Sequence, residues 1–234
     1  MKKMLVTDYD QTFYINDEDI ELNKKMVDKF MALGNVFVIA TGRSYFDFNN
    51  KLKIYNFKYD YVILNHGATI IDKNSNILLN ISMPNDIIPN LKEDLQLDKS
   101  LNCFCCSGID SRVNFEHSDL TKINVKYSTK EEAMEKSVII NKKYGKFVNA
   151  YYVNTNSIEI ISKKTNKASS IYEVMKQEKI DKSNVSTIGD GYSDIEMIRE
   201  FNGYCMKESV DELKKISIKE VSSVSELVEE ILED

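Results

Sequence analysis

The chain has 234 residues, of which 42% are hydrophobic and 29% charged, and its net charge at pH 7 is −6. A chain of this length can bury about 70% of the surface that its unfolded form exposes, which is enough for a large core or two smaller ones. The acidic balance gives no general attraction to nucleic acid, four cysteines in so long a chain make no disulfide framework, and two histidines disfavour a histidine-rich zinc site.

The N-terminal sequence shows no targeting signal. Met1-Lys2-Lys3 leads directly into a short apolar run, and no stretch approaches the roughly 20 apolar residues of a membrane span. We therefore expect a cytoplasmic protein without a nucleic-acid or membrane partner. Monomer and dimer are both compatible with the sequence.

The first third of the chain alternates short apolar runs with a helical pattern. Apolar runs at 4–7, 35–40 and 61–64 are typical of strands that are covered on both faces. Between the first two, apolar residues recur at helical spacing over 22–33, and Gly34 follows where a helix would end. This alternation predicts βαβ units and a parallel sheet.

The pattern changes after residue 64. Apolar segments at 68–71 and 77–81 flank a polar turn and predict a hairpin, and both prolines of the chain, Pro84 and Pro89, follow it. Because proline does not fit a central strand, we expect a domain boundary here. Beyond it the sequence predicts a small α+β module, with helices near 86–96 and 130–143 and strands near 101–107, 111–116, 122–128 and 147–153.

The first pattern then resumes. Ser157–Ser162 and a helix near 167–178 are assigned to the parallel unit, and 185–188 is its fourth strand. Shorter helices and strands follow to the C-terminus. We therefore predict an α/β fold: a doubly wound parallel-sheet core formed by residues 1–80 plus 158–234, with an α+β domain inserted at 81–157.

Ligands of doubly wound sheets bind beyond the carboxyl ends of the strands. Four loops occupy such positions, at 8–12, 40–44, 65–68 and 189–194, and they contain four of the eight glycines. Glycine permits close approach of a ligand to backbone N–H groups. The clustering favours a binding site over simple turns.

Two of these loops carry pairs of acids, Asp8 with Asp10 and Asp190 with Asp194. Four carboxylates converging at one sheet edge are costly without a divalent cation, and all-oxygen ligands point to Mg²⁺. The alternative is that these acids cap helices or turns.

The remaining candidates carry donors for an anion. Thr12, Thr41, Gly42 and Arg43 supply hydroxyl and N–H groups where Thr41 opens a helix, and helix N-termini bind phosphate. Lys167 begins a helix, where its ammonium could screen an anionic nucleophile and a phosphate together. The alternatives are helix capping by Ser44 and a solvated surface lysine.

These motifs resemble those of the haloacid dehalogenase (HAD) superfamily of phosphohydrolases. Asp8-Tyr9-Asp10-Gln11-Thr12 is similar to its D-x-D-x-T motif, Thr41 matches the second motif, Lys167 the third, and residues 189–194 (GDGYSD) the fourth. The insert is placed like the C2 cap of the Cof-type branch, which includes sugar-phosphate phosphatases.

The resemblance implies a phosphatase that acts on a small phosphorylated metabolite, and the Cof-type branch suggests a sugar phosphate as the candidate. Asp8 would be the nucleophile that forms an aspartyl-phosphate, and Asp10 the acid and base. Mg²⁺ would be held by Asp8, the backbone carbonyl of Asp10 and Asp190, with Asp194 as a ligand or close by. His66 and Gly67, in the loop after the third strand, would lie on the substrate side.

The sequence departs from the family pattern at three places. Gln11 stands where glycine is usual, Ser193 where asparagine is commoner, and His66 where the Cof-type branch usually has asparagine. None of these changes removes a catalytic group. Two alternatives stay open: a phosphomutase of the phosphomannomutase type, and a catalytically idle HAD protein that serves as a binding or regulatory module.

Overall fold

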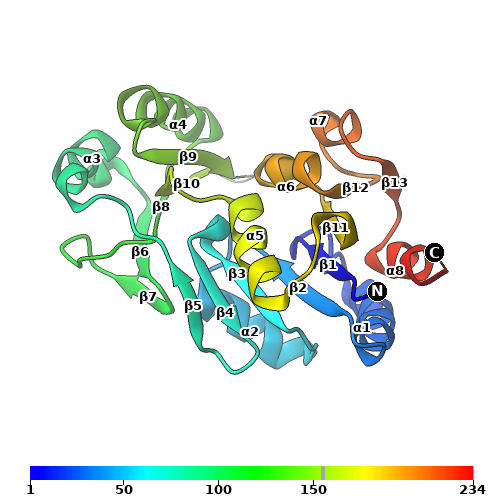
Figure 1. Cartoon of the computed structure of the whole chain (residues 1–234). Coiled ribbons are helices and arrows are strands. Elements are labelled where there is room, and N and C mark those ends of the chain that lie inside the picture. The colour runs from blue at the N-terminus through cyan, green and yellow to red at the C-terminus, as the bar shows by residue number, and fades with distance from the viewer. Residues whose placement is uncertain (154–155, 234) are drawn as a thin grey trace.

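In the computed structural model, described for residues 1–153 and 156–233, the chain forms two sheets. The larger sheet has eight strands in the order β13-β12-β11-β1-β2-β3-β4-β5, and the smaller has five in the order β7-β6-β8-β10-β9. Figure 1 shows them as two parts of the molecule. The strands of the larger sheet are β1 (Met4–Thr7), β2 (Val36–Ala40), β3 (Tyr61–Leu64), β4 (Thr69–Asp72), β5 (Ile77–Asn80), β11 (Val185–Gly189), β12 (Asn202–Met206) and β13 (Lys219–Val221).

The larger sheet is parallel from β13 to β3 and ends in the antiparallel strands β4 and β5. The chain runs outward from β1 through β2 to β3, and later outward in the other direction from β11 through β12 to β13. The direction reverses between β1 and β11, which makes their carboxyl ends the expected place for a ligand. The α/β fold class predicted from the sequence is confirmed.

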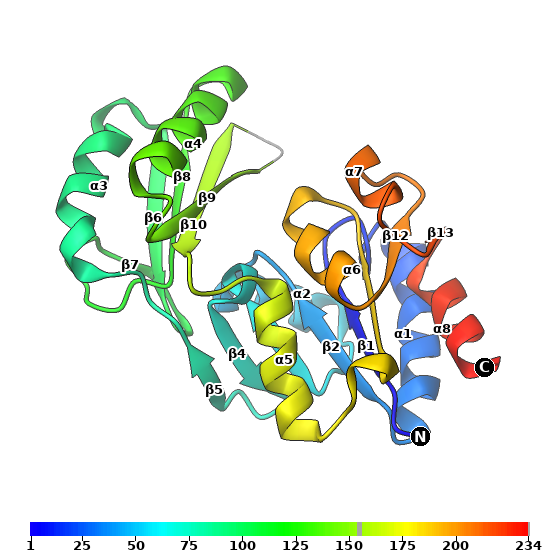
Figure 2. The same cartoon turned by 45° about the horizontal axis from the view of Figure 1, so that its top comes forward.

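The central strands of this sheet are covered on both faces, since β1, β2 and β3 are buried at every position. Leu5, Phe37 and Ile39 face one cluster, whereas Val6 and Val38 face the other. Helices α1 (Asp17–Ala32), α2 (Tyr45–Tyr55) and α8 (Val224–Glu233) cover the first face, and α5 (Lys167–Glu178), α6 (Ile195–Glu200) and α7 (Asp211–Lys214) cover the second. Figure 2 shows α1 and α5 on opposite sides of β1 and β2.

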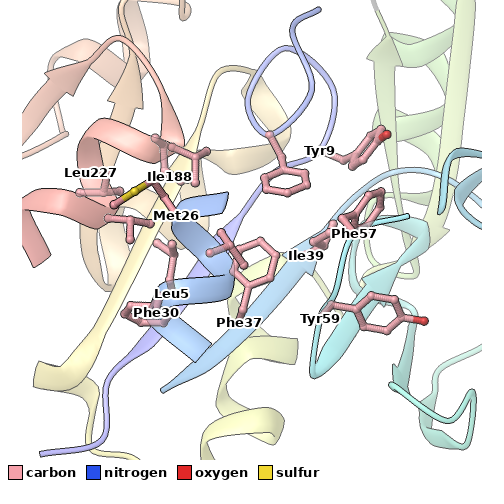
Figure 3. Packing of buried hydrophobic residues seen from close by; sticks show 14 of the residues in the cluster. Leu5, Tyr9, Met26, Phe30, Phe37, Ile39, Phe57, Tyr59, Ile188 and Leu227 are labelled. Atoms are coloured by element: carbon pink, nitrogen blue, oxygen red, sulfur yellow. The ribbon is translucent and has the colours of Figure 1, made fainter. Parts of the chain in front are cut away.

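The first of these clusters is rich in aromatic residues. Figure 3 shows Leu5 and Ile188 of the sheet among Met26, Phe30 and Leu227 of the covering helices. Removing such apolar surface from water stabilises the fold by roughly 25 cal/mol per Å². The loop that follows β1 is packed into the same cluster, since its Tyr9 and Phe13 are fully buried there.

Local signals fix where the helices begin and end. The side chain of Asn16 accepts hydrogen bonds from Glu18 N and Asp19 N and caps α1, and Gly34 follows that helix with φ of +84°. Asn166 caps α5 by accepting from Ser169 N. Lys167 thus occupies the first turn of α5, whose start is fixed by the cap.

The smaller sheet has its own core. It consists of β6 (Asn102–Ser107), β7 (Asp110–Val113), β8 (Lys122–Lys126), β9 (Val148–Val153) and β10 (Ser157–Ser162), all paired antiparallel. Helices α3 (Ile88–Leu95) and α4 (Lys130–Tyr144) pack on one face, where Ile123, Val125, Ile158 and Ile160 meet Leu91 and Ile140. Figure 2 shows this sheet standing between α3 and the larger sheet's helices.

One strand assignment from the sequence is wrong. Ser157–Ser162 was expected to rejoin the parallel unit, but β10 pairs with β8 and β9 in the smaller sheet. The run is almost wholly buried, as a parallel strand would be, because β10 is a central strand of its sheet. The division at 1–80, 81–157 and 158–234 stays a prediction, and the second boundary fits better after Ser162.

In the part of the chain that the structure describes, no helix combines the length and the apolar character needed to cross a bilayer.

Candidate active site

Asp8 of the first motif and both acids of the fourth motif meet where β1 and β11 end. Thr7 pairs with Ile188 in register, and Asp8 N continues the ladder by donating to Ile188 O over 2.9 Å. Asp8 and the loop after Gly189 therefore leave the sheet side by side. One carboxylate oxygen from each of Asp8, Asp190 and Asp194 lies within 4.8 Å of the other two.

Lys167 is buried between two of these acids. Its Nζ donates to Asp8 Oδ1 and to Asp194 Oδ1, each over 2.5 Å, and 1% of the side chain is exposed. The predicted position of Lys167 beside the acids is thus observed, and the alternative of a solvated surface lysine is excluded.

Gly67 allows the start of α5 to approach the loop after β3 closely. A Cβ on this residue would lie 2.4 Å from the carbonyl oxygen of Asn166, the residue that caps α5. The Gly67 carbonyl also accepts hydrogen bonds from Thr165 Oγ1 (2.8 Å) and Ser170 Oγ (2.7 Å). Gly67 is buried and packs against the start of α5, so its place in the structure is that of a support for Lys167.

Asp194 uses both of its oxygens within the site. Oδ1 accepts from Lys167, and Oδ2 accepts from Asp190 N (3.1 Å) and Gly191 N (3.0 Å). A Cβ on Gly189 would lie 2.5 Å from the Asp194 carboxyl carbon, so glycine is needed for this approach. Asp194 therefore fixes both the ammonium and the loop that carries Asp190.

The charges of this cluster do not balance. Burial raises the pKa of the Asp8 carboxyl well above its ordinary range, with Lys167 opposing and both Asp194 and Asp190 reinforcing the effect. Burial, together with Asp194, also raises the pKa of Asp190 to about 6. For Lys167, burial acts to lower the pKa, but Asp194 and Asp8 outweigh it and the pKa lies above its ordinary value. Three carboxylates share one ammonium, so a further cation would be favourable here.

The donor set fits Mg²⁺. Hard oxygen ligands from Asp8 and Asp190 suit this ion, which commonly keeps several waters and takes one or two carboxylates. Asp190 Oδ1 accepts from Thr12 Oγ1 over 3.0 Å, which orients the carboxylate. Thr12 itself is fully buried behind Asp190.

The Asp10 carboxylate lies outside this cluster and pairs with Arg43. Nε and Nη2 of Arg43 donate to the two oxygens of Asp10 over 2.8 and 2.7 Å. Gln11, next in the chain, has φ of +61°, in the left-handed region that glycine adopts most readily. This backbone requirement explains why a glycine is usual at the position of Gln11.

The loop after β2 lines the same cavity as the acids. Thr41 Oγ1 accepts from Arg43 N over 3.1 Å, and Ser44 caps α2, as the alternative reading of this segment proposed. A Cβ on Gly42 would lie 2.4 Å from the His66 ring, so glycine lets the imidazole cover this loop. Thr41, Gly42, Arg43 and His66 line one cavity with Asp8 and Asp10.

This cavity has a volume of about 570 Å³ and is closed on one side by the smaller sheet. Sequence reasoning did not find the residues of that wall, because it could not tell which face of the inserted sheet meets the core. The alternation along β10, with Ile158 and Ile160 in the module's core and Glu159 between them, was the available signal. The wall consists of Phe104, Lys122, Tyr151, Tyr152, Val153 and Glu159.

Comparison with known proteins points to a single family. The sequence model of the haloacid dehalogenase-like hydrolases matches residues 5–148 and 106–227. A relative from Buchnera aphidicola is 24% identical, covering 85% of this chain and 83% of its own, and one from Haemophilus influenzae is 22% identical, covering 87% and 85%; both are named "Putative phosphatase". An HAD/COF-like hydrolase from Plasmodium vivax superposes with a TM-score of 0.84 at 16% identity over 99% of this chain and 96% of its own, a likeness of fold.

Proposed function

The chain belongs to the haloacid dehalogenase-like hydrolase family, and within that family we propose that it is a Mg²⁺-dependent phosphatase. Its substrate would be a small phosphorylated metabolite, and a sugar phosphate fits the size of the cavity. The observation that carries the proposal is the contact of Lys167 with both Asp8 and Asp194 at the junction of β1 and β11.

Asp8 is the nucleophile in this proposal. It lies at the cavity wall, and its carboxylate is held by Lys167 through one oxygen. Attack on phosphorus by the carboxylate forms an aspartyl-phosphate and releases the alcohol, and water then hydrolyses that intermediate. The ammonium of Lys167 stabilises the anionic form of Asp8 and offsets charge on the phosphate.

Asp10 serves as the acid and base. It protonates the leaving oxygen in the first step and takes a proton from water in the second. Because both of its oxygens accept from Arg43, this pair has to open when a phosphate ester enters. Arg43 then becomes free to donate to the substrate, as do the groups of Thr41 and Gly42 beside it.

Asp8, Asp190 and the backbone carbonyl of Asp10 would hold Mg²⁺, with Asp194 alongside. When bound, the ion supplies positive charge against the phosphate and the crowded carboxylates. Asp194 contributes mainly by holding Lys167 and the 190–191 loop, since both of its oxygens are already engaged.

The test is phosphate release from an aryl phosphate with and without Mg²⁺. We expect turnover that needs Mg²⁺, is abolished by Asp8→Asn and is retained by Asp181→Asn, which alters an exposed carboxylate away from the site. An idle binding protein would release no phosphate under any of these conditions. A phosphomutase would instead need a bisphosphate and turn over without net release.

A further inference from the structure

The cavity wall opposite the acids carries a second buried group of charges. Lys122 on β8 and Glu159 on β10 project from the face of the smaller sheet that is turned away from α3 and α4. Lys122 Nζ donates to Glu159 Oε1 over 3.0 Å and to the Gly42 carbonyl over 2.6 Å. Only 2% of the Lys122 side chain and 12% of the Glu159 side chain are exposed.

Glu159 is the centre of this group. Its Oε1 also accepts from Asn124 Nδ2 over 3.1 Å, and its Oε2 is hydrogen-bonded to His66 Nε2. Burial acts to raise the pKa of Glu159, but Lys122 and His66 outweigh burial and hold it well below its ordinary value. Glu159 is therefore held as an anion that is paired with the Lys122 ammonium and hydrogen-bonded to His66.

The other cationic side chain of the cavity is matched in the same way. Arg43 donates through two nitrogens to Asp10. Among the described residues that line the cavity, Arg43 and Lys122 are the two with a fixed positive charge, and carboxylates such as Asp47 and Glu208 outnumber them. In the proposed reaction the phosphate that releases Arg43 from Asp10 takes up the charge of Arg43, whereas Lys122 stays paired with Glu159.

The phosphate of a substrate belongs at the Asp8 end, so the alcohol it leaves behind faces the wall formed by Phe104, Lys122 and Glu159. A second anionic group there would meet carboxylates and an ammonium that is already neutralised. Unpaired like charges at close range are a strong means of rejecting a ligand.

We propose that Glu159 is a specificity-determining residue that, by neutralising Lys122, restricts the enzyme to phosphate esters whose alcohol carries no second anionic group. The inference rests on the proposed phosphatase function and narrows its substrate class. It also gives a physical reason against bisphosphates as substrates of this site.

The test uses two compounds that differ at one carbon, glycerol 3-phosphate with a hydroxymethyl group and 3-phosphoglycerate with a carboxylate. The ratio of kcat/KM for the pair is measured in the wild type, Glu159→Gln, Asn124→Ala and the double variant Lys122→Met/Glu159→Gln. Dissociation constants for both compounds are measured by calorimetry on the same four proteins in the presence of Mg²⁺.

We expect the wild type to prefer glycerol 3-phosphate by at least about tenfold. Glu159→Gln leaves the Lys122 ammonium unmatched and should lower the preference by about tenfold. Asn124→Ala removes a hydrogen bond to Glu159 without changing charge, so the ratio should stay within about twofold of the wild type. The double variant removes both charges and should regain the wild-type preference.

Equal use of the two compounds by the wild type would overturn the proposal without any variant. An unchanged ratio in Glu159→Gln would also overturn it, as would an Asn124→Ala ratio that falls as far, because geometry rather than charge would then set the preference. If neither compound is hydrolysed, the binding ratios decide this inference, and the absence of turnover counts against the phosphatase proposal alone.

Discussion

Two buried groups of charges face each other across the cavity, and they differ in balance. At the strand ends, Asp8, Asp190 and Asp194 share the single ammonium of Lys167, and the pKa of Asp190 rises to about 6. On the opposite wall, Glu159 is matched by Lys122 and its pKa falls. An excess of negative charge favours the binding of a further cation. The matched pair instead lies within the smaller sheet, and its contacts with Gly42 and His66 link that sheet to loops of the larger one.

Removing the nucleophile should have the largest effect and separate activity from stability. Asp8→Asn should lower kcat by at least about a thousandfold, because an amide keeps the shape but cannot attack phosphorus. The melting temperature should be unchanged or higher, since one carboxylate of a crowded group is neutralised. Retention of more than a few per cent of wild-type turnover in a purified sample would remove Asp8 from this role.

Breaking the pair of Lys122 and Glu159 should affect stability more than activity, the reverse of what we expect for Asp8→Asn. Lys122→Met leaves Glu159 buried without its cation and should lower the free energy of unfolding by about 3 kcal/mol, whereas Lys122→Met/Glu159→Gln should recover most of this loss. Urea unfolding measures the free energy of unfolding of both variants, and Lys142→Met, on the exposed face of α4, is the control. A double variant as unstable as the single one would mean that packing of Lys122, not its charge, matters.

The unmatched acids should respond to Mg²⁺ in a way that the matched pair does not. An ion that binds only the folded state at a hundredfold excess over Kd stabilises it by about 2.7 kcal/mol. Thermal unfolding should show this increase in the wild type and in Asp181→Asn, and EDTA should reverse it. An equal increase in stability with Mg²⁺ in Asp190→Asn would mean that the ion does not bind at Asp190.

The smallest expected effect is on how stability depends on pH. A single titrating group changes the free energy of unfolding by at most about 1.4 kcal/mol per pH unit. The pKa of Glu159 is lowered on folding, so its contribution to stability is present above its unfolded pKa of about 4.3 and lost as the pH falls further. The pKa of Asp190 is raised on folding, so its contribution is present below about pH 4 and lost as the pH rises through 6.

Urea unfolding in EDTA across this range tests both signs. The difference in unfolding free energy between the wild type and Glu159→Gln should narrow below about pH 4.5. As the pH rises from about 4 to 6, the wild type should lose stability relative to Asp190→Asn. Parallel curves for all three proteins would contradict the contrast between the two groups.

The sequence was sufficient to predict the unmatched group and insufficient for the matched one, for a physical reason. An apolar run followed by an acid marks the end of a buried strand, and parallel strands bring such ends to one edge, so Asp8, Asp190 and Asp194 could be placed together. Asp10 was expected with them but pairs with Arg43, and Lys167 was placed there only through the family resemblance. Glu159 lies in the middle of a strand, and nothing local says which face of that strand meets a different sheet.

The sequence also could not predict which residues of separate loops would contact each other. The pairing of Arg43 with Asp10 and the packing of Gly67 against Asn166 depend on distances that only the assembled fold sets. The assignment of β10 to the parallel sheet was wrong for a related reason: a central antiparallel strand and a parallel strand share its buried, apolar pattern.

The central claim is that Asp8 carries the phosphoryl group during turnover. The most direct measurement mixes the protein with an aryl phosphate and Mg²⁺, quenches it in acid within the first turnover, and maps the phosphorylated residue by mass spectrometry. We predict a phosphoryl group on the peptide that contains Asp8 in the wild type and none in Asp8→Asn. Phosphate release with no phosphoryl group on Asp8 at any quench time, or with the group on another residue, would contradict the account.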